Sequence, residues 1–139
     1  MFQKLWIWLF CILLITGCTQ TTLNTMPAGT TPGTGQLRGQ LLTTNGQTLG
    51  NRTVRLAMVY GEGAQLAYVA DESGGLGGVT DARGAFAIAD IPPGRYVLLV
   101  VLREGISIAL LQPNGSEKII TIRADAQEDL GTVKIRLPE

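Results

Sequence analysis

Residues 79–102, VTDARGAFAIADIPPGRYVLLVVL, decide the fold because they contain two strand patterns and the turns that shape them. Asp81 and Gly84 fit a type I turn closed by a residue with positive φ, which glycine adopts without a Cβ clash. Phe86 and Ile88 then alternate with alanines, a period of two that is typical of a strand. The pattern predicts a strand with one large apolar face and one face of small side chains.

A second strand pattern follows the PPG sequence at residues 92–94. One face carries Tyr96, Leu98, Val100 and Leu102, and the reverse face carries Val97, Leu99 and Val101. The outer face of a sandwich is normally polar, so an apolar reverse face indicates either a partner surface or cover by another part of the same chain. Residues 65–78 or the chain termini could supply that cover.

Residues 1–17 have the features of a secretory signal peptide, and Cys18 follows directly. Lys4 precedes an almost wholly apolar run at residues 5–15, which is too short to span a bilayer. The sequence LITGC at residues 14–18 resembles the lipobox of bacterial lipoproteins. The resemblance implies cleavage before Cys18 and attachment of two or three acyl chains, enough for durable anchoring to membrane lipid. The alternative is a plain secretory signal with an incidental cysteine.

The same resemblance bears on the location of the protein. It implies an extracytoplasmic chain that is lipid-anchored to a membrane. Thr19 follows Cys18, where an Asp usually retains such proteins in the inner membrane, so the resemblance implies the outer membrane in an organism with two membranes. Residues 19–35 lack charge and are rich in Thr, Gly and Pro, which is typical of a flexible linker. We therefore expect a lipidated Cys18 and linker over residues 18–35.

The charge balance and the missing histidine exclude several function classes. The chain has 11 basic and 11 acidic residues, which argues against a nucleic-acid partner. It contains no histidine, so the usual general base and the commonest metal ligand are absent. The remaining carboxylate pairs are residues 71 and 72, residues 128 and 129, and Asp81 with Asp90, all where turn or loop acids are ordinary. We therefore expect that the protein is not an enzyme and that it has no catalytic residue and no cofactor.

The acidic and glycine-rich sequence DESGGLGG at residues 71–78 is a second place to look for a ligand. Asp71, Glu72 and Asp81 could offer oxygen ligands to calcium, but their spacing matches no recognised calcium loop. The glycines lack the following Lys-Ser or Lys-Thr and the helix that a phosphate loop needs. This composition predicts a mobile loop whose acidic side chains face solvent and hold no metal ion.

Short alternating segments recur every eight to twelve residues after the linker, and this spacing favours a sandwich or barrel. The expected strands are residues 36–43, 53–60, 65–70, 85–89, 96–102, 106–111, 119–122 and 132–137. They predict an all-β domain over residues 36–138 with seven or eight antiparallel strands. Phe86 and Tyr96 are expected to meet between its two sheets.

The sequences RGQL at 38–41, NG at 45–46, TDARGAF at 80–86 and IPPGRYVL at 91–98 resemble the carboxypeptidase regulatory-like domain. The resemblance implies a transthyretin-like (prealbumin-like, Ig-like) β-sandwich, related in shape to starch-binding-like modules. Such domains are accessory modules in many proteins, so the family indicates no particular ligand. Residues 65–78 are long for the family, which implies either an extra hairpin or a binding loop.

These observations together predict a membrane-anchored envelope lipoprotein that displays a non-catalytic binding or assembly module. The expected partner is an envelope protein or a polysaccharide, through a surface at Val97, Leu99 and Val101. The alternative is a carbohydrate-binding module at the cell surface. That alternative is limited by aromatic content, because only Tyr60, Tyr68, Phe86 and Tyr96 follow Cys18 and two of them are assigned inward.

Overall fold

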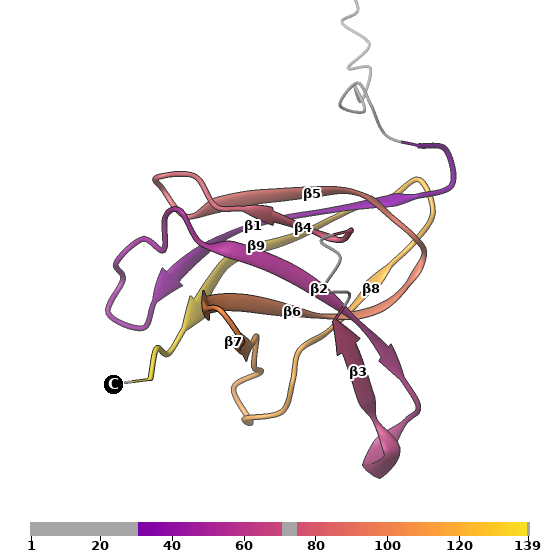
Figure 1. Cartoon of the computed structure of the whole chain (residues 1–139). Helices are drawn as coiled ribbons and strands as arrows, with labels where there is room; N and C mark the ends of the chain where they lie inside the picture. The colour runs from indigo at the N-terminus through magenta and orange to yellow at the C-terminus, as the bar shows by residue number, and fades with distance from the viewer. Residues whose placement is uncertain (1–30, 71–74, 139) are drawn as a thin grey trace, which may run out of the picture.

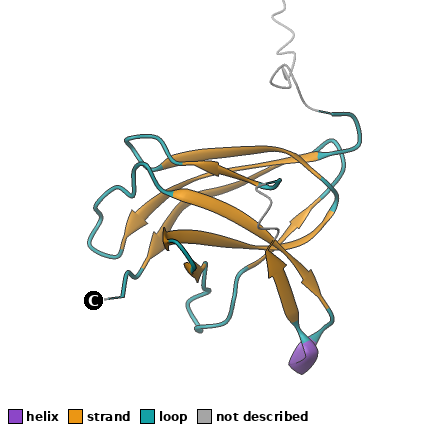
Figure 2. Cartoon of the chain, viewed as in Figure 1, coloured by secondary structure: helices purple, strands orange, loops and turns teal. Residues whose placement is uncertain are grey.

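Two facing β-sheets of unequal size make up the part of the chain that the computed structural model describes, residues 31–70 and 75–138 (Figure 1). The strands are β1 Gly35–Thr43, β2 Thr53–Tyr60, β3 Ala67–Ala70, β4 Gly77–Val79, β5 Ala85–Ile91, β6 Gly94–Arg103, β7 Ile106–Ala109, β8 Ile119–Ile122 and β9 Gln127–Ile135. In Figure 2 the described part consists of strands joined by loops, with one short helical turn, η1 (Gly63–Gln65), at the tip between β2 and β3.

The smaller sheet has the order β5-β1-β9, and the larger sheet has the order β3-β2-β6-β7. In the larger sheet β4 also pairs with β2, and β8 also pairs with β6. This arrangement confirms the predicted all-β sandwich. The described residues form nine strands instead of the expected seven or eight, because β4 forms in a segment expected to be a loop. The last strand, β9, begins at Gln127, before the expected start at residue 132.

The strands β1 and β9 run parallel, whereas the other pairs are antiparallel as expected. This pair places the starts of β1 and β9 at one end of the sandwich, and their last residues, Thr43 and Ile135, at the other. We call the first the tether end, because the chain enters the described part there, and the second the distal end. The described part of the chain ends at the distal end (Figure 1).

The stretch that decides the fold connects the two sheets. Gly84, with φ of 80°, donates its N–H to the Asp81 carbonyl oxygen at 2.9 Å, and the Asp81 carboxylate caps the same turn by accepting from the N–H of Arg83. Farther on, the chain crosses from β5 in the smaller sheet to β6 in the larger one. The Tyr96 hydroxyl donates to the Pro92 carbonyl at 2.8 Å, which closes that crossing.

The core lies between the two sheets and contains the large side chains of both strand patterns. Phe86 is 5% exposed and Tyr96 is fully buried, so the prediction that both face the interior is confirmed. The remaining buried side chains of this cluster are Leu37, Leu41, Leu49, Val54, Leu56, Ile88, Ile91, Leu98, Val100, Leu110, Ile120, Ile122, Val133 and Ile135. Each large aliphatic or aromatic side chain contributes about 1.5–3 kcal/mol when it is fully buried.

Residues 31–70 and 75–138 contain no helix that is long and apolar enough to cross a membrane. The predicted signal peptide and Cys18 lie outside the described residues.

Candidate partner-binding surfaces

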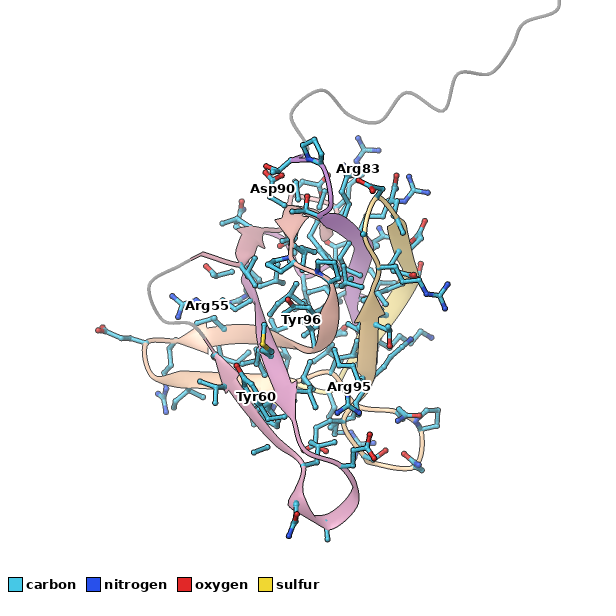
Figure 3. The ribbon with its side chains drawn as sticks, turned by 90° about the vertical axis from the view of Figure 1, so that its right-hand side faces the viewer. Arg55, Tyr60, Arg83, Asp90, Arg95 and Tyr96 are labelled. Atoms are coloured by element: carbon cyan, nitrogen blue, oxygen red, sulfur yellow. The ribbon has the colours of Figure 1, made fainter. Side chains whose placement is uncertain are left out.

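Two aspartates hold the last part of the linker against the tether end. The Thr31 N–H donates to the Asp90 carboxylate at 2.6 Å, and the Gly33 N–H donates to the Asp125 carboxylate at 2.9 Å. Figure 3 shows Asp90 beside the point where the chain enters the described part. The linker is therefore held against the sandwich from Thr31 onward, before the expected boundary at residue 36.

The geometry of both aspartates suits this contact. Asp90 and Asp125 have φ values of 55° and 54°, in the left-handed region that few residues other than glycine, asparagine and aspartate adopt. The hydrogen bond from the Thr31 N–H lowers the pKa of Asp90 below its ordinary value, because the bond stabilises the charged carboxylate. The arrangement fixes the direction in which the chain enters the sandwich.

The carboxylates considered as catalytic pairs accept structural hydrogen bonds in turns and between strands. Asp81 and Asp90 lie at opposite ends of β5, so the fold does not bring them together. The hydrogen bond from the Gly131 N–H, and then the bond from Arg38 at 2.8 Å, lower the pKa of Asp129. Asp71 and Glu72 lie outside the described residues. Within the described ranges, no three His, Cys, Asp or Glu side chains are grouped to hold a metal ion.

The reverse face of β6 is covered by the chain itself. Val97 is fully buried and Leu99 is 8% exposed, whereas Val101 is half-buried. Val97 and Leu99 lie in a second apolar cluster with Ala57 and Val59, and Leu66, Ala70 and Ala109 pack against it. Val97 and Leu99 therefore do not form an exposed patch, which corrects the expectation of a partner surface at these two residues.

Residues 65–78 supply part of that cover, as the alternative interpretation of this face required. β3 pairs with β2 to form an extra hairpin, which carries Leu66 and Ala70 over the reverse face. Residues 71–74 of the segment lie outside the described residues. The hairpin extends beyond the rest of the sandwich (Figure 1) and exposes Tyr60, Tyr68 and Val69. In the register, Tyr68 pairs with Val59 and Tyr60 pairs with Ala67, so the two tyrosines lie on opposite faces.

A groove of about 940 Å³ lies on the open side of the sandwich, between β7 with its following loop and the C-terminal half of β9. Its apolar wall includes Leu110, Leu111, Val133 and Ile135, of which Leu111 is 53% exposed and the others belong to the core. Three cationic residues, Lys118, Lys134 and Arg136, also line the groove, and no Asp or Glu of residues 31–70 and 75–138 does. We call this the cationic groove.

The three cations of the groove have no carboxylate within ion-pair distance among the described residues. In that part of the chain the ion pairs are Arg38–Asp129 and Arg95–Glu62. Sequence reasoning missed the cationic groove because its walls come from residues 107–118 and residues 130–136, which belong to different sheets and meet only when the two sheets face each other. The alternation of Val133, Lys134, Ile135 and Arg136 is the one signal of it in the sequence.

A second, shallower hollow of about 630 Å³ lies on the outer face of the smaller sheet. Its floor includes the small residues Gly39, Ala85 and Ala87, and the Arg38–Asp129 ion pair borders it. Asp81 also lines the hollow, so its charged lining is one cation and two carboxylates.

Comparisons with known proteins give fold-level likenesses only. No protein-family description matches the chain, and no curated protein matches its sequence. Among solved structures, it is similar to a 9R-lipoxygenase from Cyanothece PCC8801, with 19% identity over 80% of this chain and 18% of that one, at a TM-score of 0.40. It is also similar to a Pseudomonas aeruginosa protein provisionally described as carbohydrate-binding, with 17% identity, 78% and 92% coverage and a TM-score of 0.45. A third is BcpA, the major pilin subunit of Bacillus cereus, with 16% identity, 76% and 30% coverage and a TM-score of 0.42.

Proposed function

We propose that this protein is an envelope lipoprotein that presents a carboxypeptidase regulatory-like β-sandwich as a non-catalytic binding or assembly module for another protein. Acylated Cys18 holds it outside the cytoplasm on membrane lipid, at the outer membrane in an organism with two membranes. The linker then carries the sandwich away from the lipid surface.

The observation that carries this proposal is the two-ended geometry of the sandwich. Asp90 and Asp125 hold the linker at the tether end, and the cationic groove lies beside the end of β9 at the distal end. A chain anchored through Cys18 would therefore turn its tether end toward the membrane and its groove away from it. That orientation suits a module that meets a partner beyond the lipid surface.

The state of the carboxylates supports a non-catalytic role. The pKa values of Asp90 and Asp129 are lowered by hydrogen bonds to their charged forms. A carboxyl group that donates a proton in catalysis near neutral pH needs its pKa raised instead, usually by burial. Both groups are better suited to fixing the linker and the β1–β9 pair.

Carbohydrate binding remains the alternative proposal, and the placement of the exposed tyrosines does not favour it. Stacking on a sugar needs aromatic rings that form a common platform. Tyr60 and Tyr68 lie on opposite faces of the β2–β3 hairpin, and Phe86 and Tyr96 are buried. A glycan array probed with the full chain would detect binding if the alternative holds.

The anchoring part of the proposal is tested by changing Cys18→Ser in cells that express the full chain. We expect the wild-type protein to incorporate an alkyne-bearing fatty acid and to sediment with membranes, and the variant to lose the label and the membrane association. Cys11→Ser is the matched control, since it removes the other cysteine within the expected signal peptide and should change neither result. Unlabelled wild-type protein, or a Cys18→Ser variant that stays labelled and membrane-bound, would refute the anchor.

A further inference from the structure

We infer that the cationic groove binds an extended acidic segment of a partner protein, which adds as a new strand to the free edge of β9. This inference rests on the proposed function, because it identifies the kind of partner that a binding module of this shape accepts.

The backbone of β9 leaves hydrogen-bonding groups directed away from its neighbour. β9 lies at the edge of the order β5-β1-β9, and the Thr44 N–H donates to the Ile135 carbonyl oxygen at 3.1 Å. The peptide groups of Ile135 therefore face β1. Because peptide groups alternate in direction along a strand, those of Lys134 face the opposite edge. An added strand would find hydrogen-bonding partners there.

The walls of the groove suit an occupant of strand width. The larger sheet continues over this side through β7 and the loop that follows it, whereas the smaller sheet stops at β9. The sandwich is therefore open between them, and its core residues Val133, Ile135 and Leu110 reach the groove. A strand added to β9 would place alternate side chains against this apolar wall and against the exposed Leu111.

The charge of the groove selects an acidic strand. Lys118, Lys134 and Arg136 line it, no carboxylate of the described part of the chain does, and Lys118 is half-buried. A basic segment would place like charges together at this edge, whereas Asp or Glu side chains would complement it. A second copy of the chain is disfavoured for the same reason, since pairing two β9 edges would bring both sets of Lys134 and Arg136 together.

The first test measures binding of a fluorescent peptide of alternating valine and glutamate to the full chain in detergent micelles, by anisotropy. The matched valine–lysine peptide is the control for charge. We expect saturable binding of the acidic peptide alone. A variant with Lys118→Gln, Lys134→Gln and Arg136→Gln should bind it about tenfold more weakly. A variant with Arg52→Gln, Arg83→Gln and Arg123→Gln, which removes the same charge elsewhere, should bind as the wild type does.

The second test separates strand addition from simple charge attraction. Lys134→Pro removes an N–H that does not face β1, so it should leave the sheet intact while it removes one hydrogen bond to the added strand. We expect Lys134→Pro to bind the acidic peptide more weakly than Lys134→Gln. In the wild-type chain, amide exchange at Lys134 should slow when the peptide is added, a readout that holds even if the proline variant fails to fold.

Equal binding of the two peptides, or full binding by the triple variant of the groove, would overturn the inference. Binding without slower exchange at Lys134 would overturn strand addition as its mode. These results are distinguishable from failure of the proposed function, because the Cys18→Ser experiment does not depend on the groove. A partner that crosslinks only to another face would agree with the proposed binding module but would refute the groove as its binding site.

Discussion

The carboxylate of Asp90 accepts a hydrogen bond of 2.6 Å from the backbone N–H of Thr31, which lies 59 positions earlier in the chain. Asp125 accepts from Gly33 at 2.9 Å in the same way, and the Asp125 N–H donates to the Thr34 carbonyl oxygen at 2.8 Å. These contacts make the end of the linker part of the sandwich. They also determine which end of the domain would face a membrane to which Cys18 is anchored.

Neutralising the two carboxylates should weaken the contact of residues 31–34 with the sandwich, because an amide oxygen accepts a weaker hydrogen bond than a charged carboxylate. A double variant with Asp90→Asn and Asp125→Asn keeps side chains that tolerate a positive φ but removes both charges. We expect faster amide exchange at Thr31 and Gly33, with an unchanged exchange rate at core amides. Glu104→Gln, at the exposed turn between β6 and β7, is the control and should leave all these rates unchanged.

The bond from Thr31 should also depend on pH in a defined direction. The pKa of Asp90 is lowered from its ordinary value of 3.8, chiefly by the Thr31 N–H. The stabilisation is therefore complete above that ordinary value and is lost as the pH falls through the lower pKa of the folded state. NMR titration of the Asp90 carboxyl carbon should give a midpoint below 3.8. A midpoint at or above this value would contradict the contact.

Gly84 should tolerate substitution less well than Gly46, although both have positive φ, of 80° and 83° respectively. A Cβ at Gly84 would overlap the carbonyl oxygen of Leu41, whereas one at Gly46 would meet no atom within 4 Å. Gly46→Ala should cost about 1–2 kcal/mol from backbone strain alone. Gly84→Ala should cost about 1–3 kcal/mol of stability beyond that, because its methyl group would overlap backbone atoms. Equal losses in urea denaturation would show that the turn is not packed against β1.

Tyr96→Phe should weaken the crossing from β5 to β6, because it leaves the Pro92 carbonyl without its 2.8 Å donor. The expected loss in the free energy of unfolding is about 0.5–1.5 kcal/mol.

Burial of the Tyr96 ring, followed by the nearby Tyr60, raises the pKa of the Tyr96 hydroxyl above its ordinary value of 10.0. Its stabilisation is therefore complete below that value and lost as the pH rises through the higher folded pKa. In a pH titration followed by tyrosinate absorbance, the ionisation step at the highest pH should be present in the wild type and absent in Tyr96→Phe. If the variant keeps that step, the raised pKa does not belong to Tyr96.

Leu99→Lys tests whether the reverse face of β6 is core or surface. Leu99 is 8% exposed under Leu66 and its neighbours, so we expect a loss of about 2–5 kcal/mol in the free energy of unfolding. Val69→Lys, in the same sheet but 61% exposed, should change stability by less than about 0.5 kcal/mol. A stable Leu99→Lys variant would restore this face as a surface for a partner.

Local sequence patterns predicted the parts of the fold that depend on neighbouring residues. The alternation around Phe86 and Tyr96 gave the inward faces of β5 and β6, and Gly84 gave the turn before β5. The start of β9 was missed because residues 127–131 lack an alternating apolar pattern, and β4 was missed because its sequence is Gly-Gly-Val. Glycines predict a loop unless a neighbouring strand, here β2, supplies the pairing.

The surfaces were harder to predict because they depend on contacts between distant segments. Val97 and Leu99 have the same local pattern whether or not Leu66 covers them, so periodicity alone could not decide between surface and core. The cationic groove lies between β7 with its following loop in the larger sheet and β9 in the smaller sheet, and no local motif specifies that these segments meet. Asp90 and Asp125 resemble ordinary loop acids until the fold brings Thr31 and Gly33 beside them.

The most direct test of the central claim, that the distal groove of an anchored sandwich meets a protein partner, is site-specific photocrosslinking in intact cells. A photoreactive side chain replaces Leu111, in the cationic groove, or Arg123, at the exposed turn before β9 at the tether end. We expect a discrete protein adduct from position 111 that the groove triple variant abolishes, and none from position 123. Adducts from position 123 alone, or the same adducts from both positions, would contradict it.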